Sequence, residues 1–246
     1  MKQRVIISRH LKTELTKAIA ECEHDRIFVL VDETTNKLCW SLVKDYLCLK
    51  DAQTIIIGAT DRRKNLDTLV HVWESLQQGK ATRHSLLINL GGGMVTDLGG
   101  FAASTYKRGI NFINVPTTLL AMVDASVGGK TGINFGGLKN EIGVFNDAEF
   151  VLLDTNWLRT LDEENIRSGY AEMLKHGLIA DDTMWAELIN FNLAQPNLRQ
   201  LASMLDKSVR IKERIVTEDP HEKGIRKALN LGHTFGHAFE SWAMKR

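Results

Sequence analysis

Two histidines and a glutamate have the side chains in this chain best suited to metal chemistry. His233 and His237 are four residues apart in a segment with helical periodicity, so both project from one face of the predicted helix. Such a pair is half of a typical divalent-metal site, although it is at least as often packed or exposed without a metal. Glu172, in another predicted helix, could supply a carboxylate ligand. His176 is interpreted as an ordinary packed histidine.

A glycine-rich turn favours binding of a phosphate-containing ligand. Gly91, Gly92 and Gly93 follow an apolar strand pattern and precede a predicted helix, whose free N–H groups can hold a phosphate. The spacing is not GxGxxG, and a tight turn that binds nothing is the alternative. Asp32 ends an earlier strand, where an acidic residue can accept hydrogen bonds from ribose hydroxyls or cap a helix. Together the two features point weakly to NAD.

Polar and charged residues are concentrated among apolar ones between Pro116 and Asn134, and Lys139 and Asn140 follow closely. Burying such groups is costly unless they are paired or meet a ligand. Lysine and asparagine side chains near glycine turns suit a phosphorylated, hydroxyl-rich substrate.

The apolar runs predict the elements that hold these residues. Short β-branched runs alternate with helical patterns, which predicts a parallel sheet covered on both faces. After about Leu161 only helical patterns follow, the last of them predicted as one helix over Ile225–Met244. We therefore expect an α/β domain at 1–158 and an all-α domain at 159–246. The predicted strands are Arg26–Val31, Thr54–Ile57, Ser85–Leu90, Asn111–Val115 and Phe150–Leu153, and the earlier helices of the second domain are Glu163–Ile179, Met184–Leu193 and Leu198–Thr217.

Composition excludes several classes of protein. The 246 residues include 31 Lys+Arg and 30 Asp+Glu, and a net charge of +1 does not support a nucleic-acid or anionic-membrane partner. A hydrophobic content of 43% excludes disorder, and the longest apolar runs are too short to cross a bilayer. The first residues show no signal-peptide core or small-residue cleavage site, and the three cysteines lack CxxC spacing. We therefore expect a cytoplasmic protein with reduced thiols.

Four longer motifs together resemble the 3-dehydroquinate synthases. They are GGGMVTDLGGFAAS, NVPTTLLAMVDASVGGKTGIN, SGYAEMLKHG and ALNLGHTFGHAFES, in that family's order and spacing. The resemblance implies a Rossmann-like N-terminal domain, a helical C-terminal domain and a site in the cleft. It also implies conversion of 3-deoxy-D-arabino-heptulosonate 7-phosphate to 3-dehydroquinate and phosphate, a step of the shikimate pathway to aromatic amino acids. That reaction proceeds by NAD-mediated transient oxidation, phosphate elimination, re-reduction and intramolecular aldol closure.

The resemblance also assigns roles to single residues. Glu172 and His233 match ligands of a divalent metal, usually zinc or cobalt, whereas His237 matches a histidine that helps proton transfer. Asp124 matches a residue where cofactor and substrate meet, and Arg108 matches one that reaches the substrate phosphate from the other subunit of a homodimer. The residues matched to NAD binding are Asp32, Asp61, Lys64, Gly92, Gly93, Asp97, Thr117, Thr118, Lys130, Lys139 and Thr160. Those matched to substrate binding are Lys130, Asn140, Lys175, Lys212, Arg226 and Asn230.

The family's third metal ligand is a histidine in an HGE-like motif a short way after His237. We expect it beyond residue 246, so the helical domain is predicted to be cut short and to bind metal weakly. Three alternatives remain. The chain could be another sugar-phosphate cyclase, such as a 2-deoxy-scyllo-inosose or valiolone-type synthase, a metal-dependent alcohol dehydrogenase, or an NAD-binding module without activity. The lysines, arginine and asparagine matched to the substrate argue against the last two.

Overall fold

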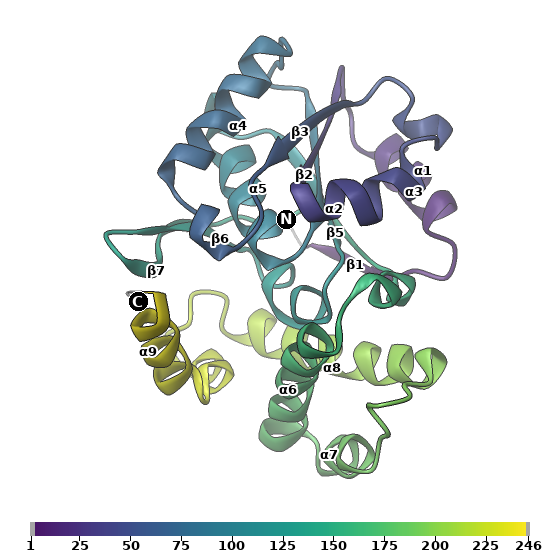
Figure 1. The fold of residues 1–246 in the computed structure, drawn as a ribbon, viewed down its shortest axis with the longest axis vertical. Coiled ribbons are helices and arrows are strands. Elements are labelled where there is room, and N and C mark those ends of the chain that lie inside the picture. The colour runs from purple at the N-terminus through teal and green to yellow at the C-terminus, as the bar shows by residue number, and fades with distance from the viewer. Residues whose placement is uncertain (1–2, 245–246) are drawn as a thin grey trace.

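The computed structural model describes residues 3–244, without the side chains of residues 237, 240, 241, 243 and 244. Within this range a six-stranded parallel sheet has the order β1-β8-β5-β4-β2-β3. Helices α4 and α5 lie on one side of the sheet and α1 and α3 on the other (Figure 1). The predicted α/β architecture is confirmed. The strands are β1 (Arg4–Ile7), β2 (Ile27–Asp32), β3 (Gln53–Ile57), β4 (Leu86–Gly91), β5 (Asn111–Pro116), β6 (Lys130–Phe135), β7 (Leu138–Phe145) and β8 (Phe150–Leu153).

The last four helices gather at one end of the molecule, as predicted for a helical C-terminal part (Figure 1). Helices α6 and α8 pack against the short helical turn Ala121–Ala125 that follows β5. The helices are α1 (Leu11–Glu21), α2 (Glu33–Thr35), α3 (Ser41–Val43), α4 (Leu66–Gln78), α5 (Gly93–Thr105), α6 (Glu163–Ala180), α7 (Asp182–Ile189), α8 (Leu198–Glu218) and α9 (His233–Met244).

One continuous cluster of buried apolar side chains runs from Leu11 in α1 to Leu229 after α8. It includes the apolar faces of the sheet and those of α6 and α8, so burial of these side chains holds the two parts of the chain together. A 3-10 turn over Thr155–Thr160 connects β8 to α6. The division into domains at 158/159 falls in this turn and stays a prediction.

The antiparallel hairpin β6–β7 is an element that the apolar pattern does not predict. Gly132 and Gly143 face each other across the two strands, and a Cβ on Gly143 would lie 2.1 Å from the carbonyl oxygen of Thr131. The strands therefore need glycine where they approach most closely, and these glycines interrupt the alternation that marks a strand. Phe135 and Leu138, at the tip of the hairpin, are exposed.

The prediction of one helix over 225–244 is wrong. A 3-10 turn spans Ile225–Asn230, and α9 begins only at His233. Gly232, between them, has φ +82, a left-handed conformation that no α-helix contains. The helix predicted over 184–193 also ends early, at Ile189 with Asn190 as C-cap, and in the turn that follows the side chain of Asn192 accepts the backbone N–H of Ala194.

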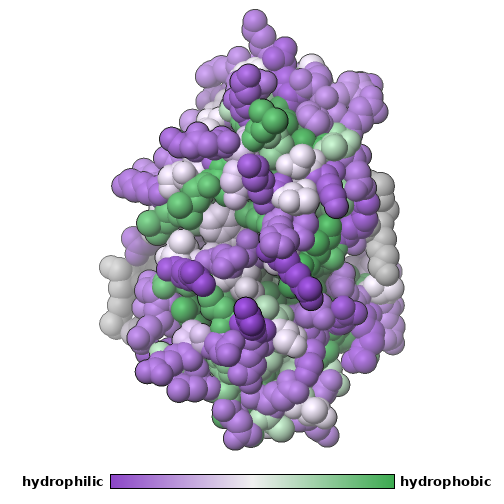
Figure 2. Space-filling view, turned by 90° about the vertical axis from the view of Figure 1, so that its right-hand side faces the viewer, coloured by the Kyte–Doolittle hydropathy of each residue, from purple (hydrophilic) through white to green (hydrophobic). Residues whose placement is uncertain are grey.

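Hydrophilic side chains predominate on the face shown in Figure 2, and apolar side chains form separate patches on it. Among residues 3–244, no helix combines the length and apolar character needed to span a bilayer. All three cysteines have free thiols, as predicted.

Candidate active site

The carboxyl ends of β2, β4 and β5 form one edge of the sheet. The chain runs outward from β2 to β3 in one direction and from β4 through β5 to β8 in the other, so β2 and β4 flank a switch point in the strand order. Parallel sheets bind ligands outside the strand ends at such a point. The glycine turn lies here, with Gly92 as the N-cap of α5.

The predicted NAD residues Gly92, Gly93, Thr117 and Thr118 lie together at this edge. The backbone N–H of Thr117 donates to the carbonyl of Gly91 at 2.9 Å, which joins the ends of β4 and β5. A Cβ on Gly92 would lie 3.1 Å from Cγ2 of Thr118. The side chain of Thr118 therefore lies against the glycine turn, and the first N–H groups of α5 point out of the same edge.

Asp32 is the last residue of β2, and its side chain caps the helix that follows. Its Oδ1 accepts the backbone N–H groups of Thr34 and Thr35, each at 2.8 Å. The backbone N–H of Asp32 in turn donates to Oγ1 of Thr35 at 2.9 Å, which completes a capping box. The structure thus confirms the capping interpretation, and a nucleotide contact stays a prediction.

Lys64 links three elements beside the glycine turn. Its side chain is 4% exposed, forms an ion pair with Asp97 of α5 and donates to Oδ1 of Asn140 in β7 at 2.5 Å. Nearby, Lys139 lies 3.4 Å from a carboxylate oxygen of Asp61. Predicted NAD residues and the predicted phosphate residue Asn140 therefore meet at one place, although they come from distant parts of the sequence.

A cavity of about 740 Å³ opens between the β6–β7 hairpin, the turn after β5 and the helical part of the chain. Many of the residues predicted for NAD and substrate line it. These are Asp97, Asp124, Lys130, Lys139, Asn140, Lys212, Arg226, Asn230 and His233.

Two buried cations of this cavity have fixed positions. Lys212, 5% exposed, forms an ion pair with the carboxylate of Asp124 and also donates to its backbone carbonyl at 2.6 Å. Burial raises the pKa of Asp124, but the Lys212 ammonium outweighs it and keeps the pKa below its usual value. Arg226, 2% exposed, donates to the carbonyls of Gly128 at 2.9 Å and Pro220 at 2.6 Å. Both cations are therefore oriented before any substrate binds.

Asp124, Glu172 and His233 place one possible ligand atom each within 4.8 Å of one another. Carboxylate and imidazole groups suit zinc and cobalt. The Lys175 ammonium already lies among them, 2.5 Å from Oε1 of Glu172 and 3.3 Å from Nε2 of His233. Burial raises the pKa of Glu172, but the nearby imidazoles of His176 and His233 and the charge of Lys175 hold it well below its usual value. The positive charge at this cluster is thus the Lys175 ammonium, and the carboxylate and imidazole atoms around it fit a divalent metal.

Glu222 is a residue of this site that the sequence reasoning misses. Its carboxylate forms an ion pair with Lys130 and accepts a hydrogen bond from Nδ2 of Asn230, both predicted substrate residues. The backbone at Glu222 has φ +57, and Asp219 accepts the N–H groups of Lys223 and Gly224 in the same loop. The only available signal is that Glu222 lies four residues before Arg226, which does not distinguish it from other surface acids.

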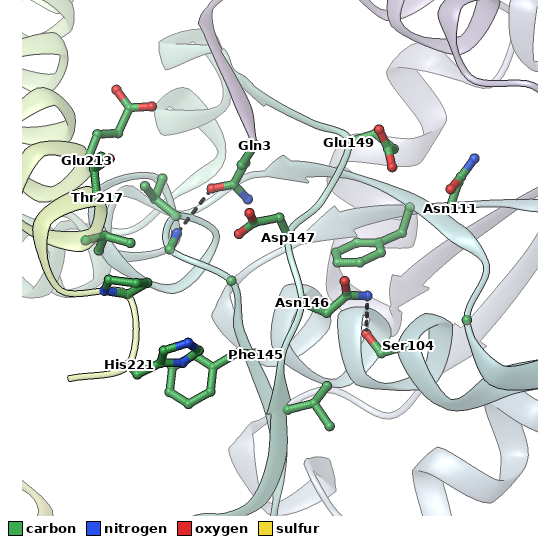
Figure 3. A pocket seen from close by; sticks show the side chains of 18 of the residues that line it. Gln3, Ser104, Asn111, Phe145, Asn146, Asp147, Glu149, Glu213, Thr217 and His221 are labelled. Atoms are coloured by element: carbon green, nitrogen blue, oxygen red, sulfur yellow. Dashed lines mark hydrogen bonds between the residues drawn. The ribbon is translucent and has the colours of Figure 1, made fainter. Parts of the chain in front are cut away.

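Arg108 and Thr160 are among the predicted residues that do not line this cavity, and the side chain of a third predicted residue is not described. Arg108 lines the adjoining cavity of about 890 Å³ shown in Figure 3, on the other side of Gly128. There the side chain of Gln3 accepts the N–H of Gly128. Thr160 donates to the carbonyl of Trp157 and lies 4.0 Å from Sγ of Cys39. The side chain of His237 lies outside the described part of the structure.

The family comparison agrees with the motifs. Residues 54–168 match the family described as 3-dehydroquinate synthase N-terminal, and residues 169–246 match 3-dehydroquinate synthase C-terminal. The chain belongs to the 3-dehydroquinate synthase family. A 3-dehydroquinate synthase of Parabacteroides distasonis is 51% identical over 98% of this chain, and one of Enterococcus faecalis is 41% identical over 89%. The chain covers 68% and 62% of the length of these two family members.

Solved structures of related cyclases share the fold. The 2-epi-5-epi-valiolone synthase of Streptomyces hygroscopicus, solved with NAD+ and Zn²⁺, is 29% identical with a TM-score of 0.85, over 99% of this chain and 69% of its own. A 2-deoxy-scyllo-inosose synthase, solved with carbaglucose-6-phosphate, NAD+ and Co²⁺, is 26% identical with a TM-score of 0.86, over 96% of this chain and 66% of its own. The predicted Rossmann-like fold is confirmed.

Proposed function

We propose that this member of the 3-dehydroquinate synthase family converts 3-deoxy-D-arabino-heptulosonate 7-phosphate to 3-dehydroquinate and phosphate. The observation that carries the proposal is that one cavity joins oriented cations to a cluster of carboxylates and an imidazole. Asp97 lines this cavity and lies in α5, which begins at the glycine turn. Its ion pair with Lys64 links the cavity to the NAD edge. Phosphate elimination from a hydroxyl-rich acid requires these parts in one place.

NAD supplies reversible oxidation of a substrate hydroxyl when bound, and a divalent metal polarises that hydroxyl. We assign NAD to the edge formed by Asp32, the glycine turn and Thr117–Thr118. The metal is assigned to Glu172 and His233, beside Asp124. Both assignments rest on the geometry described above and on NAD and metal in the two related cyclases.

The cations of the cavity bind the anionic groups of the substrate. Lys130 and Arg226 are assigned to the phosphate, since both line the cavity and Arg226 is fixed by two carbonyls. Oriented cations stabilise phosphate both as a bound group and as a leaving group. Lys212 and Lys175 are assigned to substrate hydroxyls and the carboxylate. Glu222, in contact with Lys130 and Asn230, is a carboxylate near enough to exchange a proton with a bound substrate.

Phosphate release measures this function directly. The purified chain is mixed with 3-deoxy-D-arabino-heptulosonate 7-phosphate, NAD and Zn²⁺ or Co²⁺, and phosphate is followed with time. We expect release that depends on NAD and metal, is abolished in Lys212→Met and is unchanged in Lys207→Met, a control on the same helix whose ammonium pairs with Glu187. Stronger inhibition by carbaglucose 6-phosphate than by the substrate's own product would instead indicate another cyclase of this fold.

We also propose that the chain acts in the cytoplasm as a homodimer in which Arg108 serves the partner's site. Two observations support this arrangement. Arg108 lines the adjoining cavity and not the one that holds the other substrate residues. The β6–β7 hairpin beside that cavity exposes Phe135, Leu138 and Phe145, an apolar surface available to a second copy. Sedimentation equilibrium tests the dimer.

A further inference from the structure

A completely buried histidine beside the metal cluster has no role in the proposed function. His176 of α6 and Ser208 of α8 are both 0% exposed, and Nδ1 of His176 lies 2.7 Å from Oγ of Ser208. The other ring nitrogen, Nε2, has no hydrogen-bond partner among the described residues, and it lies 3.5 Å from Oε1 of Glu172. Burying a polar atom without a hydrogen bond costs free energy, so the position of Nε2 beside Glu172 needs an explanation.

The neighbours of the ring decide which nitrogen carries the proton. If Nδ1–H donated to Ser208, the lone pair of Nε2 would face the Glu172 carboxylate and repel it. If the Ser208 hydroxyl donates to Nδ1, then Nε2–H faces the carboxylate and attracts it. The second arrangement is favoured electrostatically. Ser208 therefore selects the form of His176 that is a donor toward Glu172.

The two oxygens of Glu172 face different groups. Oε1 has the Lys175 ammonium at 2.5 Å and Nε2 of His176 at 3.5 Å. Oε2 lies 3.8 Å from Nε2 of His233. His176 is absent from the set Asp124, Glu172 and His233 whose donor atoms converge. The imidazole of His176 thus contacts Oε1 of Glu172, whereas His233 lies nearest Oε2.

We propose that His176 is a positioning residue: held by Ser208, it anchors Oε1 of Glu172 and leaves Oε2 directed toward His233 for a divalent cation. This inference rests on the cation site of the proposed function. Groups behind a carboxylate ligand fix its orientation, and their removal commonly weakens metal binding by 10- to 100-fold.

Co²⁺ binding tests the proposal without any measurement of turnover. The visible absorption of Co²⁺ reports its ligands, and titration gives its dissociation constant. We expect His176→Leu to weaken Co²⁺ binding by about 10- to 100-fold and Ser208→Ala by about 10-fold. His176→Gln should retain most of the affinity, because its side-chain N–H can still donate to Glu172. In the metal-free protein, NMR of the ring nitrogens should show the proton of His176 on Nε2.

Tyr170→Phe is the matched control. It removes a buried hydrogen bond of the same helix, from the Tyr170 hydroxyl to the carbonyl of Leu188 at 2.7 Å, away from the cluster. This variant should lose stability and keep its Co²⁺ affinity. Wild-type affinity in both His176→Leu and Ser208→Ala overturns the positioning role and leaves the proposed function intact. Equal loss in His176→Gln and His176→Leu, with an altered Co²⁺ spectrum, makes His176 a direct ligand. No Co²⁺ binding by the unaltered chain overturns both the cation site and this inference.

Discussion

Replacing Lys64 by methionine tests whether the ion pair with Asp97 holds the NAD edge together. The Lys64 side chain is 4% exposed and that of Asp97 is 18% exposed, so the substitution leaves a carboxylate largely buried without its cation. Breaking a buried pair in this way costs about 3 to 5 kcal/mol, and the partial exposure of Asp97 places the cost near the lower value. We therefore expect Lys64→Met to reduce the free energy of unfolding by about 3 kcal/mol.

Urea unfolding followed by the fluorescence of the five tryptophans measures this change. With a slope of about 3 kcal/mol per M urea, the midpoint should fall by about 1 M. In the Asp97→Asn background the same lysine substitution should cost only about 1 kcal/mol, since no buried charge is left behind. Lys17→Met, at an exposed position of α1, controls for loss of a lysine. Equal costs in the two backgrounds would refute the reasoning, because they would show that Lys64 and Asp97 are not coupled.

Three further predictions concern the fold and the site. Gly99→Ala should lower stability by about 3 kcal/mol in thermal unfolding, because its Cβ would lie 2.0 Å from a buried side-chain oxygen, whereas Gly236→Ala, with open space at its Cβ, should not lower it. Asp32→Asn should keep the helix cap, whereas Asp32→Ala should lower the free energy of unfolding by about 1 kcal/mol. Calorimetry should show weaker binding of NAD to both variants. Unchanged NAD affinity in Asp32→Asn would exclude a contact through the carboxylate. The pKa values of Asp124 and Glu172 are lowered in the folded chain. The ionised carboxylates therefore stabilise the folded chain fully above their pKa values in the unfolded chain, about 3.8 and 4.5, and this contribution declines as the pH falls below those values. Urea midpoints between pH 6.5 and 3 should show this decline, and it should be smaller in Glu172→Gln.

Local pattern predicted the sheet well because its four central strands, β2, β4, β5 and β8, are almost fully buried on both faces. The run at Phe150–Leu153 is observed without change, and the one predicted at Thr54–Ile57 begins one residue earlier, at Gln53. Continuous apolar runs of this length have few other ways to bury their side chains. The same reasoning fails for the β6–β7 hairpin, where close contact between strands requires glycine, and at Gly232, where a left-handed residue breaks a helical pattern.

The site was predicted through motif resemblance more than through physical spacing. Spacing alone pairs His233 with His237, whose side chain the structure does not describe, and among the described residues His233 lies with Asp124 and Glu172. Those three residues come from a turn after β5, from α6 and from α9, so no periodicity in the sequence could connect them. Glu222 was missed for the same reason, because its contacts with Lys130 and Asn230 exist only after a loop and a strand are brought together.

By itself the sequence determined the parallel sheet, the glycine turn at the end of β4 and the types of side chain available for chemistry. These follow from local burial and local backbone freedom, which neighbouring residues encode. Only the tertiary structure decided which charges pair, and that His176 and Ser208 lie behind Glu172. Such contacts join residues that are distant in the sequence, 88 positions apart in the case of Lys212 and Asp124. Their energies depend on burial in the shared core, which no segment of the chain possesses alone.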